Sequence, residues 1–191
     1  METKSLVLVT AATSVSKDGA AVLSDVGKEE AAFIADGLCA YLELPSNFMP
    51  RGCAEPVAVQ ILHAGTESAA QTAGAIEAAL VAAKCEVDCT AAKDALAADA
   101  DAAALQALLE GSTAKLTVAI GQLPVLSTCA TQLGVTISAG AFSPAAGVLL
   151  ETLGEAGWTL AHHIVPPSEK KSWWIHGVSV HVRADMTEDL A

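Results

Sequence analysis

The sequence predicts a three-layer α/β/α sandwich with a mostly parallel central sheet and an antiparallel hairpin towards its C-terminal end. Two observations predict this fold. Short apolar runs rich in Val, Ile and Leu alternate with longer segments of helical periodicity, and such alternation is typical of strand–helix–strand units. The short runs are apolar at nearly every position, as in parallel strands that helices cover on both faces.

The first part of the chain supplies two strand–helix units. Ser5–Thr10 (SLVLVT) is predicted to be a buried strand. A polar loop then leads to a helix that Ser24 or Asp25 can cap and that runs to about Leu44. Val57–His63 (VAVQILH) is the second strand, and the segment directly after it is predicted to be the second helix.

The middle of the chain continues the alternation. Cys85–Cys89 is a weak third strand, and Ala91–Glu110 is predicted to be helical with a break near Asp99–Asp101. Leu116–Ile120 (LTVAI) is the fourth strand. A further helix follows from Pro124, because proline is favoured in the first turn of a helix.

Two final strands and a tail complete the chain. Gly147–Leu153 and Trp158–Val165 flank a four-residue turn and are predicted to form an antiparallel hairpin. We therefore expect one α/β domain over residues 1–167. Residues 168–191 differ in composition and are expected to form a separate tail.

Composition and charge exclude several classes of protein. The chain has 191 residues, 22 Asp and Glu against 10 Lys and Arg, and a net charge of −12. This balance argues against binding nucleic acid, which needs clustered basic residues. The hydrophobic fraction of 52% argues against general disorder. We expect no membrane span, since no apolar run approaches the roughly 18 residues that one requires.

The cysteines and histidines suggest neither a metal site nor a cofactor. The five cysteines are odd in number and scattered, which favours free thiols in a reducing intracellular compartment, either the cytosol or an organelle matrix. Cys85 and Cys89 are about 13 Å apart along an extended strand, too far for a disulfide. His162 and His163 are neighbours on a strand and face opposite sides, so they are not expected to chelate one metal ion.

Five segments in this order resemble the histidine phosphatase superfamily, and in particular its small phosphohistidine-phosphatase-like branch. They are LVLVT-A-A-T, LSDVGKEEA, ILHAGTESAAQTA, LTVAIGQLPVLS and WTLAHHIVPP. The resemblance covers about Ser5 to Pro167. It implies a ligand site at the carboxyl ends of the strands, where open α/β sheets bind their ligands.

The resemblance also implies which groups that chemistry requires. The family has an Arg-His pair after the first strand, a second Arg before the Gln-Thr pair, and a second His after the Gly that ends the fourth strand. At these positions the sequence has Thr10 and Ala11, Ser68, and Gln122. Because a methyl group cannot attack phosphorus, the resemblance predicts a phosphatase-like fold without phosphatase activity.

Other side chains can line the same cleft. The candidates are the residue at position 12 (Ala12), His63, Glu67 and Gly121. They can bind a small anion or metabolite through the backbone N–H groups that open the second helix and follow Gly121, or His63 can support altered hydrolytic chemistry with Ser68. A simpler interpretation makes His63 a backbone-bonded histidine and Glu67 a favourable charge in a helix's first turn.

The tail is the other candidate for function. Trp173, Trp174, Ile175 and His176 are the candidate docking residues, because tryptophan is enriched in interface hot spots. Ile175–Val182 alternates and is predicted to form a strand, either at the edge of its own sheet or against a partner. We expect a catalytically inactive binding or structural subunit of a larger protein assembly. The alternatives are a small-metabolite or anion sensor and a hydrolase with altered catalytic residues.

Overall fold

The computed structural model describes residues 4–43, 56–137, 141–152 and 157–165, and the backbone of residues 173–175 and 178–180. A six-stranded sheet in the order β5-β4-β6-β1-β7-β8 forms its centre. These strands are β1 (Ser5–Thr10), β4 (Ala58–His63), β5 (Glu86–Ala91), β6 (Leu116–Gly121), β7 (Gly147–Thr152) and β8 (Trp158–Ile164). β1, β4, β5 and β6 are parallel, whereas β7 is antiparallel to both of its neighbours.

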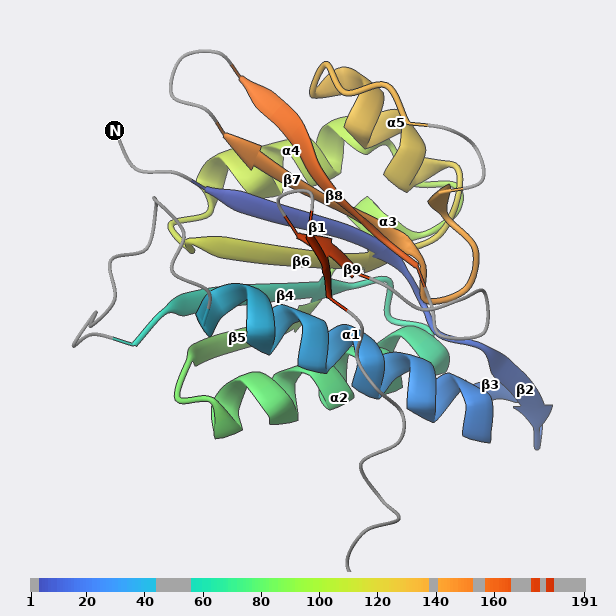
Figure 1. Cartoon of the computed structure of the whole chain (residues 1–191). Coiled ribbons are helices and arrows are strands. Elements are labelled where there is room, and N and C mark those ends of the chain that lie inside the picture. The colour runs from blue at the N-terminus through green and yellow to red at the C-terminus, as the bar shows by residue number, and fades with distance from the viewer. Residues whose placement is uncertain are drawn as a thin grey trace, which may run out of the picture.

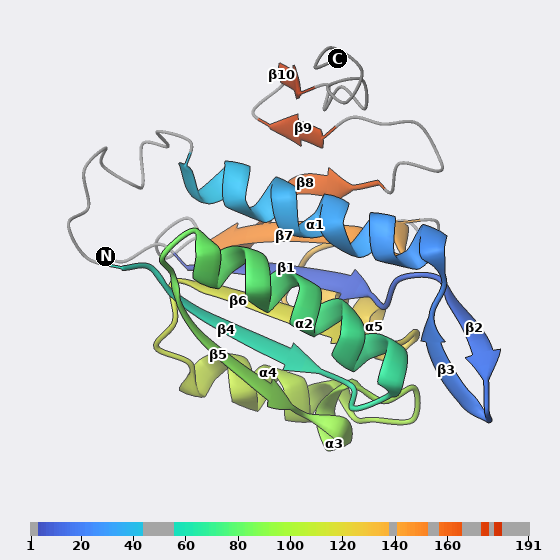
Figure 2. The same cartoon turned by 90° about the horizontal axis from the view of Figure 1, so that it is seen from below.

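Helices cover both faces of the sheet (Figures 1 and 2). One face carries α1 (Asp25–Glu43) and α2 (Glu67–Ala82), and the other carries α3 (Lys93–Leu96), α4 (Ala102–Gly111) and α5 (Val125–Gln132). This arrangement confirms the predicted sandwich and its C-terminal antiparallel pair. No helix in the described part of the chain is both long and apolar enough to cross a membrane.

The central strands are where sequence and structure agree best. β1 begins and ends at the predicted residues, and its side chains from Leu6 to Val9 are fully buried. Its neighbour β6 is buried along its whole length. Strands of this kind must be apolar on both faces, so their sequence identifies them without any alternation.

Local hydrogen bonds explain where the two long helices begin. Ser24 caps α1, since its Oγ accepts the Gly27 N–H at 2.9 Å. Thr66 caps α2 by accepting the Ala69 N–H. Of the two caps that the sequence allowed for α1, the structure therefore selects Ser24, and Asp25 pairs with Lys28 instead.

A β-hairpin occupies the segment that was expected to be a polar loop. β2 (Ser14–Lys17) pairs antiparallel with β3 (Ala20–Leu23), and the hairpin projects from the body of the molecule (Figure 2). Its two-residue turn places Asp18 and Gly19 at φ values of +52° and +84°. Asp-Gly is a strong sequence signal for such a turn, but a hairpin exposed on both faces lacks the hydrophobic alternation that predicts a strand.

The C-terminal segment differs from its prediction. Instead of one strand over Ile175–Val182, the chain forms β9 (Trp173–Ile175) and β10 (Val178–Val180), which pair antiparallel. β9 lies beside β8, beyond the edge of the central sheet (Figure 2). His176, the side chains of this segment, and the turn joining β7 to β8 lie outside the described residues, as does Cys53. The other four cysteines are free thiols, as expected.

Candidate functional site

The carboxyl ends of three parallel strands meet at one edge of the sheet. Thr10 at the end of β1 pairs in register with Gly121 at the end of β6, and Ile120 pairs with His63 at the end of β4. Ala11 and Gln122 are therefore the first residues beyond two adjacent strands. The sheet thus brings these positions to a single edge, as the sequence predicted.

Helix α2 brings Ser68 to the same edge. The Thr72 hydroxyl, which is fully buried, accepts the Ala12 N–H at 3.1 Å and donates to the Ser68 carbonyl at 2.8 Å. The Thr72 side chain therefore joins the first turn of α2 to Ala12, in the segment after β1. Ser68 is itself buried.

Glu67 and Gln71 hold the neighbouring hairpin. The Gln71 side chain donates to Glu67 Oε1 and accepts the Leu23 N–H, each at 2.8 Å. This chain of bonds ties the first turn of α2 to β3. Glu67 therefore takes part in a hydrogen-bond chain within the fold, in addition to its place in the first turn of α2.

Thr10 faces the segment before β7. Its hydroxyl donates to the carbonyl oxygens of Ser143 and Ala146, and its N–H donates to Ala146 at 3.1 Å. The Ala145 N–H in turn donates to the Ala11 carbonyl. With its only proton held by backbone oxygens, the Thr10 hydroxyl is not placed to activate a substrate.

The residues after β6 correct one prediction. The Gln122 N–H was expected to remain available for an anion, but it donates to the Leu96 carbonyl at 3.2 Å. Gly121 is buried, and a Cβ there would lie 3.0 Å from side-chain carbons of both Leu96 and Leu126. Glycine at this position therefore allows α3 to approach the end of β6. The Leu96 carbonyl of α3 then accepts the Gln122 N–H.

His63 is partly buried and bonded to its own backbone. Its Nδ1 accepts the Gly65 N–H at 3.2 Å, and its carbonyl accepts the Ala92 N–H. Burial, and secondarily the charge of Lys93, lowers the pKa of His63, so the imidazole is neutral at pH 7. Among the described residues no hydrogen bond joins Ser68 to His63, so the geometry contains no nucleophile–base pair.

Lys93 is a cation at this edge that the sequence did not identify. It begins α3, and its side chain lies over Gly65, whose Cβ would come within 2.5 Å of Lys93 carbons. Gly65 has φ +74°, which suits glycine. The sequence does not indicate that Lys93 lies near Gly65, because the two residues meet only when β5 lies next to β4.

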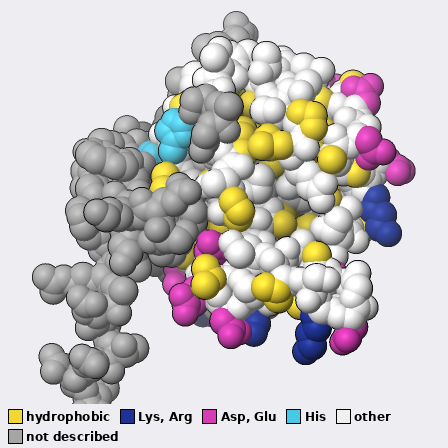
Figure 3. Space-filling view, turned by 90° about the vertical axis from the view of Figure 1, so that its right-hand side faces the viewer, with side chains coloured by type: hydrophobic (Ala, Val, Ile, Leu, Met, Phe, Trp, Pro, Cys, Tyr) yellow, Lys and Arg dark blue, Asp and Glu magenta, His cyan; other side chains and the backbone are white. Residues whose placement is uncertain are grey.

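Charge is sparse over this edge. Figure 3 views the side towards which β1, β4 and β6 run, and charged side chains lie along its right and lower margins. Uncharged and scattered hydrophobic side chains occupy the centre of the same view. Phosphoryl groups are bound by convergent guanidinium or ammonium groups, and the central surface in this view presents no such group.

The histidines of β8 and the cysteine of α5 do not add a metal site or a nucleophile. His162 is buried and His163 is exposed, as predicted for neighbours on a strand. No group of three or more metal-ligating side chains occurs in the parts of the chain that the structure covers. Burial raises the pKa of the Cys129 thiol to about 11, so this thiol is protonated and is not a nucleophile at neutral pH.

The comparisons with known proteins agree on the architecture. The structure matches the protein histidine phosphatase SixA complexed with tungstate with a TM-score of 0.64 and 18% identity, over 87% of this chain and 99% of that one. The chain has the histidine phosphatase fold. A chain assigned to SixA of Nakamurella multipartitia gives a TM-score of 0.58 at 18% identity, covering 87% and 98% of the two chains.

More distant proteins share the same fold. Phosphoglycerate mutase from Plasmodium falciparum matches with a TM-score of 0.53 and 14% identity, over 84% of this chain and 89% of that one. No protein-family model matches the sequence, and no curated protein matches it. The likeness to the histidine phosphatase fold is therefore one of architecture.

Proposed function

We propose that this chain is a non-catalytic protein of the histidine phosphatase fold that acts by binding. One observation carries the proposal: the carboxyl ends of β1 and β6 and the first turn of α2 present Thr10, Ala11, Ser68 and Gln122. None of these side chains is an imidazole or a guanidinium. Removing the nucleophile of a comparable catalytic unit lowers turnover by a factor on the order of 10⁶.

The local geometry supports this proposal over altered hydrolytic chemistry. His63 ends β4 at this edge, and its Nδ1 lone pair is used by the Gly65 N–H. A general base needs a free lone pair within reach of the proton that it removes. His63 therefore suits a structural role.

The same geometry weighs against an anion sensor. The N–H groups of Ala12, Thr13 and Gln122 donate to Thr72, Glu30 and Leu96 respectively. Donors held by the chain's own oxygen atoms are not free to bind an anion. Glu67 adds a negative charge to the first turn of α2, where an anion would otherwise be favoured.

Phosphatase turnover tests the catalytic half of the proposal. We expect the purified protein to hydrolyse p-nitrophenyl phosphate no faster than buffer, because Ala11 cannot act as a nucleophile and the Nδ1 of His63 is bonded to the Gly65 N–H. Steady-state absorbance measures the rate, and His63→Ala is the matched variant. Turnover by the wild type that disappears in His63→Ala would establish a hydrolase instead.

The binding half concerns the C-terminal tail. We propose that residues 168–191 hold a protein partner, with Trp173, Trp174, Ile175 and His176 as the docking residues. Tryptophan side chains anchor interfaces, and short strands can extend a partner's sheet. In support, β9 and β10 pair with each other in a separate two-stranded sheet, so they are not further strands of the central sheet.

Deleting Ser168–Ala191 tests the docking role. Native mass measurement on protein isolated from its source is expected to give a stable complex for the full chain and the bare monomer for the shortened chain. Unchanged thermal unfolding of the shortened chain is the control for folding. A complex that survives the deletion would exclude the tail as the docking segment.

A further inference from the structure

The central sheet ends at β5 with a row of unpaired backbone groups. β5 is the outermost strand on the side away from β8, and β4 is its neighbour (Figure 1). The N–H groups of Glu86 at its start and of Ala92 just past its end donate towards β4, at 2.9 and 2.8 Å. Backbone groups alternate in direction along a strand, so those of Val87, Cys89 and Ala91 point away from the sheet. In the described part of the chain, no hydrogen bond reaches these three N–H groups.

β5 is a regular edge strand. Its sequence, EVDCTA, contains neither proline nor lysine, and its register with β4 runs unbroken over six residues. Such an edge is a template for a further strand, and proteins usually protect it with proline, lysine or a bulge. Here the charged residues are Glu86 and Asp88. Pairing with the same strand of a second copy would bring four carboxylates together on one face, which opposes self-association.

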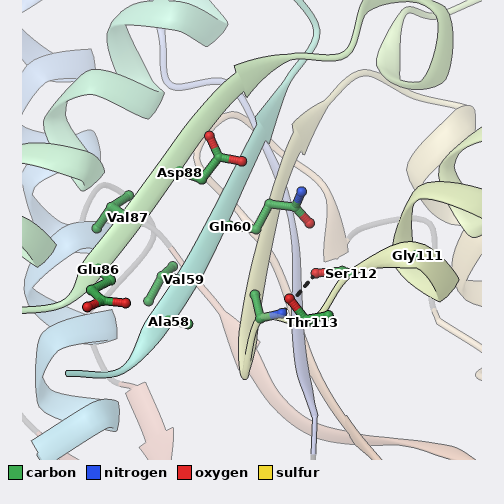
Figure 4. Close-up of a pocket in the computed structure, with 10 residues that line it drawn as sticks. Ala58, Val59, Gln60, Glu86, Val87, Asp88, Gly111, Ser112 and Thr113 are labelled. Carbon is green, nitrogen blue, oxygen red and sulfur yellow. Dashed lines mark hydrogen bonds between the residues drawn. The ribbon is translucent and has the colours of Figure 1, made fainter. Parts of the chain in front are cut away.

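The face of β5 that carries the acidic residues defines the charge of a partner. Glu86 and Asp88 are both exposed and lie two residues apart, on the same face of the strand. Thr90 continues the row, and its hydroxyl donates to Asp88 Oδ1 at 3.3 Å. Figure 4 shows Glu86 and Asp88 along β5 beside a hollow of about 370 Å³, whose lining residues include no Lys, Arg or His. The row therefore favours basic side chains opposite it and has space for them.

The opposite face of β5 is apolar and lies next to α2. Burial, and then the Glu77 carboxylate of α2, raises the pKa of the Cys89 thiol to about 11, which places Glu77 beside Cys89. α2 and β5 run in opposite directions (Figure 2). Val81, one helical turn after Glu77, therefore comes to the level of Val87, since one turn of helix and two residues of strand both span about 6 Å. Val81 is 55% exposed, so an apolar side chain beside Val87 would cover it.

We propose that β5 is a docking edge for an extended segment of another protein in which Lys or Arg alternate with Val, Ile or Leu. The backbone of this segment bonds to the open groups of β5. Its basic side chains lie opposite Glu86 and Asp88, and its apolar side chains cover Val87 and Val81. Strand addition of this kind is a common mode of peptide recognition. The tail lies at the other side of the sheet, where β9 contacts β8, so this inference is independent of the proposed docking role of the tail.

A labelled peptide of the proposed pattern tests the docking edge. The probe is fluorescein-labelled Lys-Val-Lys-Val-Lys-Val, titrated with the full chain at low salt and followed by fluorescence anisotropy. We expect saturable binding. Lys-Lys-Lys-Val-Val-Val has the same composition and charge without the alternation, and is expected to bind about tenfold more weakly or less tightly still. Equal binding of the two peptides would reflect only attraction to the net charge of −12 and would overturn the proposal.

Two double variants locate the binding surface. Glu86→Gln/Asp88→Asn is expected to weaken binding of the alternating peptide by about tenfold or more, because its basic side chains lose their partners. Glu29→Gln/Asp36→Asn removes the same two charges from exposed positions on α1 and is expected to bind as the wild type does. All four positions are exposed, so both variants are expected to fold, and thermal unfolding checks this. Equal loss of affinity in the two variants would contradict the proposal.

Amide hydrogen exchange, measured by NMR, tests the strand pairing itself. The alternating peptide is expected to slow exchange of the outward N–H groups of Val87, Cys89 and Ala91. The inward N–H groups of Asp88 and Thr90, which face β4, are expected to change little. Protection that falls on another element would overturn the proposal. So would a chain that sediments as a dimer with β5 already protected, since a second copy would then occupy the edge.

Discussion

Gly27→Ala is expected to destabilise the protein by about 3 kcal/mol, because it forces an atom into the backbone of the loop after β1. A Cβ at Gly27 would lie 1.9 Å from the Thr13 carbonyl oxygen and 2.9 Å from its carbon. The loop cannot yield easily. The Thr13 N–H donates to the buried Glu30 at 2.8 Å, and its carbonyl accepts both the N–H and the hydroxyl of Ser24.

Thermal unfolding measures this effect. For a chain of this size we expect the melting temperature to fall by roughly 6 to 12 °C. Gly74→Ala is the matched control, since Gly74 lies within α2 and a Cβ there meets nothing within 4 Å. That variant is expected to be more stable than the wild type by about 1 kcal/mol. Equal stability of the two variants would contradict the close approach of α1 to Thr13.

The second large effect is the alkaline behaviour of Tyr41, the sequence's single tyrosine. Its hydroxyl donates to the buried Glu151 at 2.5 Å and accepts from Ser5 at 2.8 Å. Burial first, and then the Glu151 carboxylate, raises the pKa of Tyr41 far above 10. The tyrosinate absorption band is therefore expected to appear only when the chain unfolds.

The sign of the pH dependence follows from the raised pKa. Below pH 10 the phenol is protonated in the folded and the unfolded chain alike, and its full contribution to stability is present. Above pH 10 the unfolded chain ionises first, so the free energy of unfolding falls by about 1.4 kcal/mol for each pH unit. Urea unfolding from about pH 9 to about pH 11, the range around the ordinary pKa of a phenol, measures this slope.

The substitution Tyr41→Phe measures how much the Tyr41 hydroxyl contributes to the free energy of unfolding. The variant is expected to lose about 1 to 3 kcal/mol at neutral pH, because the Glu151 carboxylate loses its donor. It is also expected to lose the part of the alkaline slope that comes from the phenol. A tyrosinate band with a midpoint near 10 in folded wild-type protein would show that Tyr41 is not held in this cluster.

The sequence predicted the core of the fold well because the signal there is strong. Ser5–Thr10 and Leu116–Ile120 are buried on both faces and read as unbroken apolar runs. The break between α3 and α4 was also anticipated, and Asp101 caps α4 by accepting the Ala103 N–H. The hairpin at Asp18 and Gly19 was missed, because only its turn carries a signal.

The edge of the sheet at which the candidate residues lie follows from the strand order, whereas their hydrogen bonds do not. Strand order alone brings Ala11 and Gln122 to one edge, so their proximity followed from the fold. That the Gln122 N–H donates to Leu96 depends on where α3 packs, which no local pattern reveals.

Covalent phosphorylation of the protein itself tests the central claim most directly. The purified wild-type chain is incubated with phosphoramidate, which phosphorylates accessible nucleophilic imidazoles, and its intact mass is then measured. Because Ala11 stands at the end of β1 and the His63 Nδ1 is bonded to Gly65, we predict the same set of masses for the wild type and for His63→Ala, since any label on an exposed imidazole such as His163 is common to both. A phosphorylated form that disappears in His63→Ala, together with release of inorganic phosphate, would contradict the account.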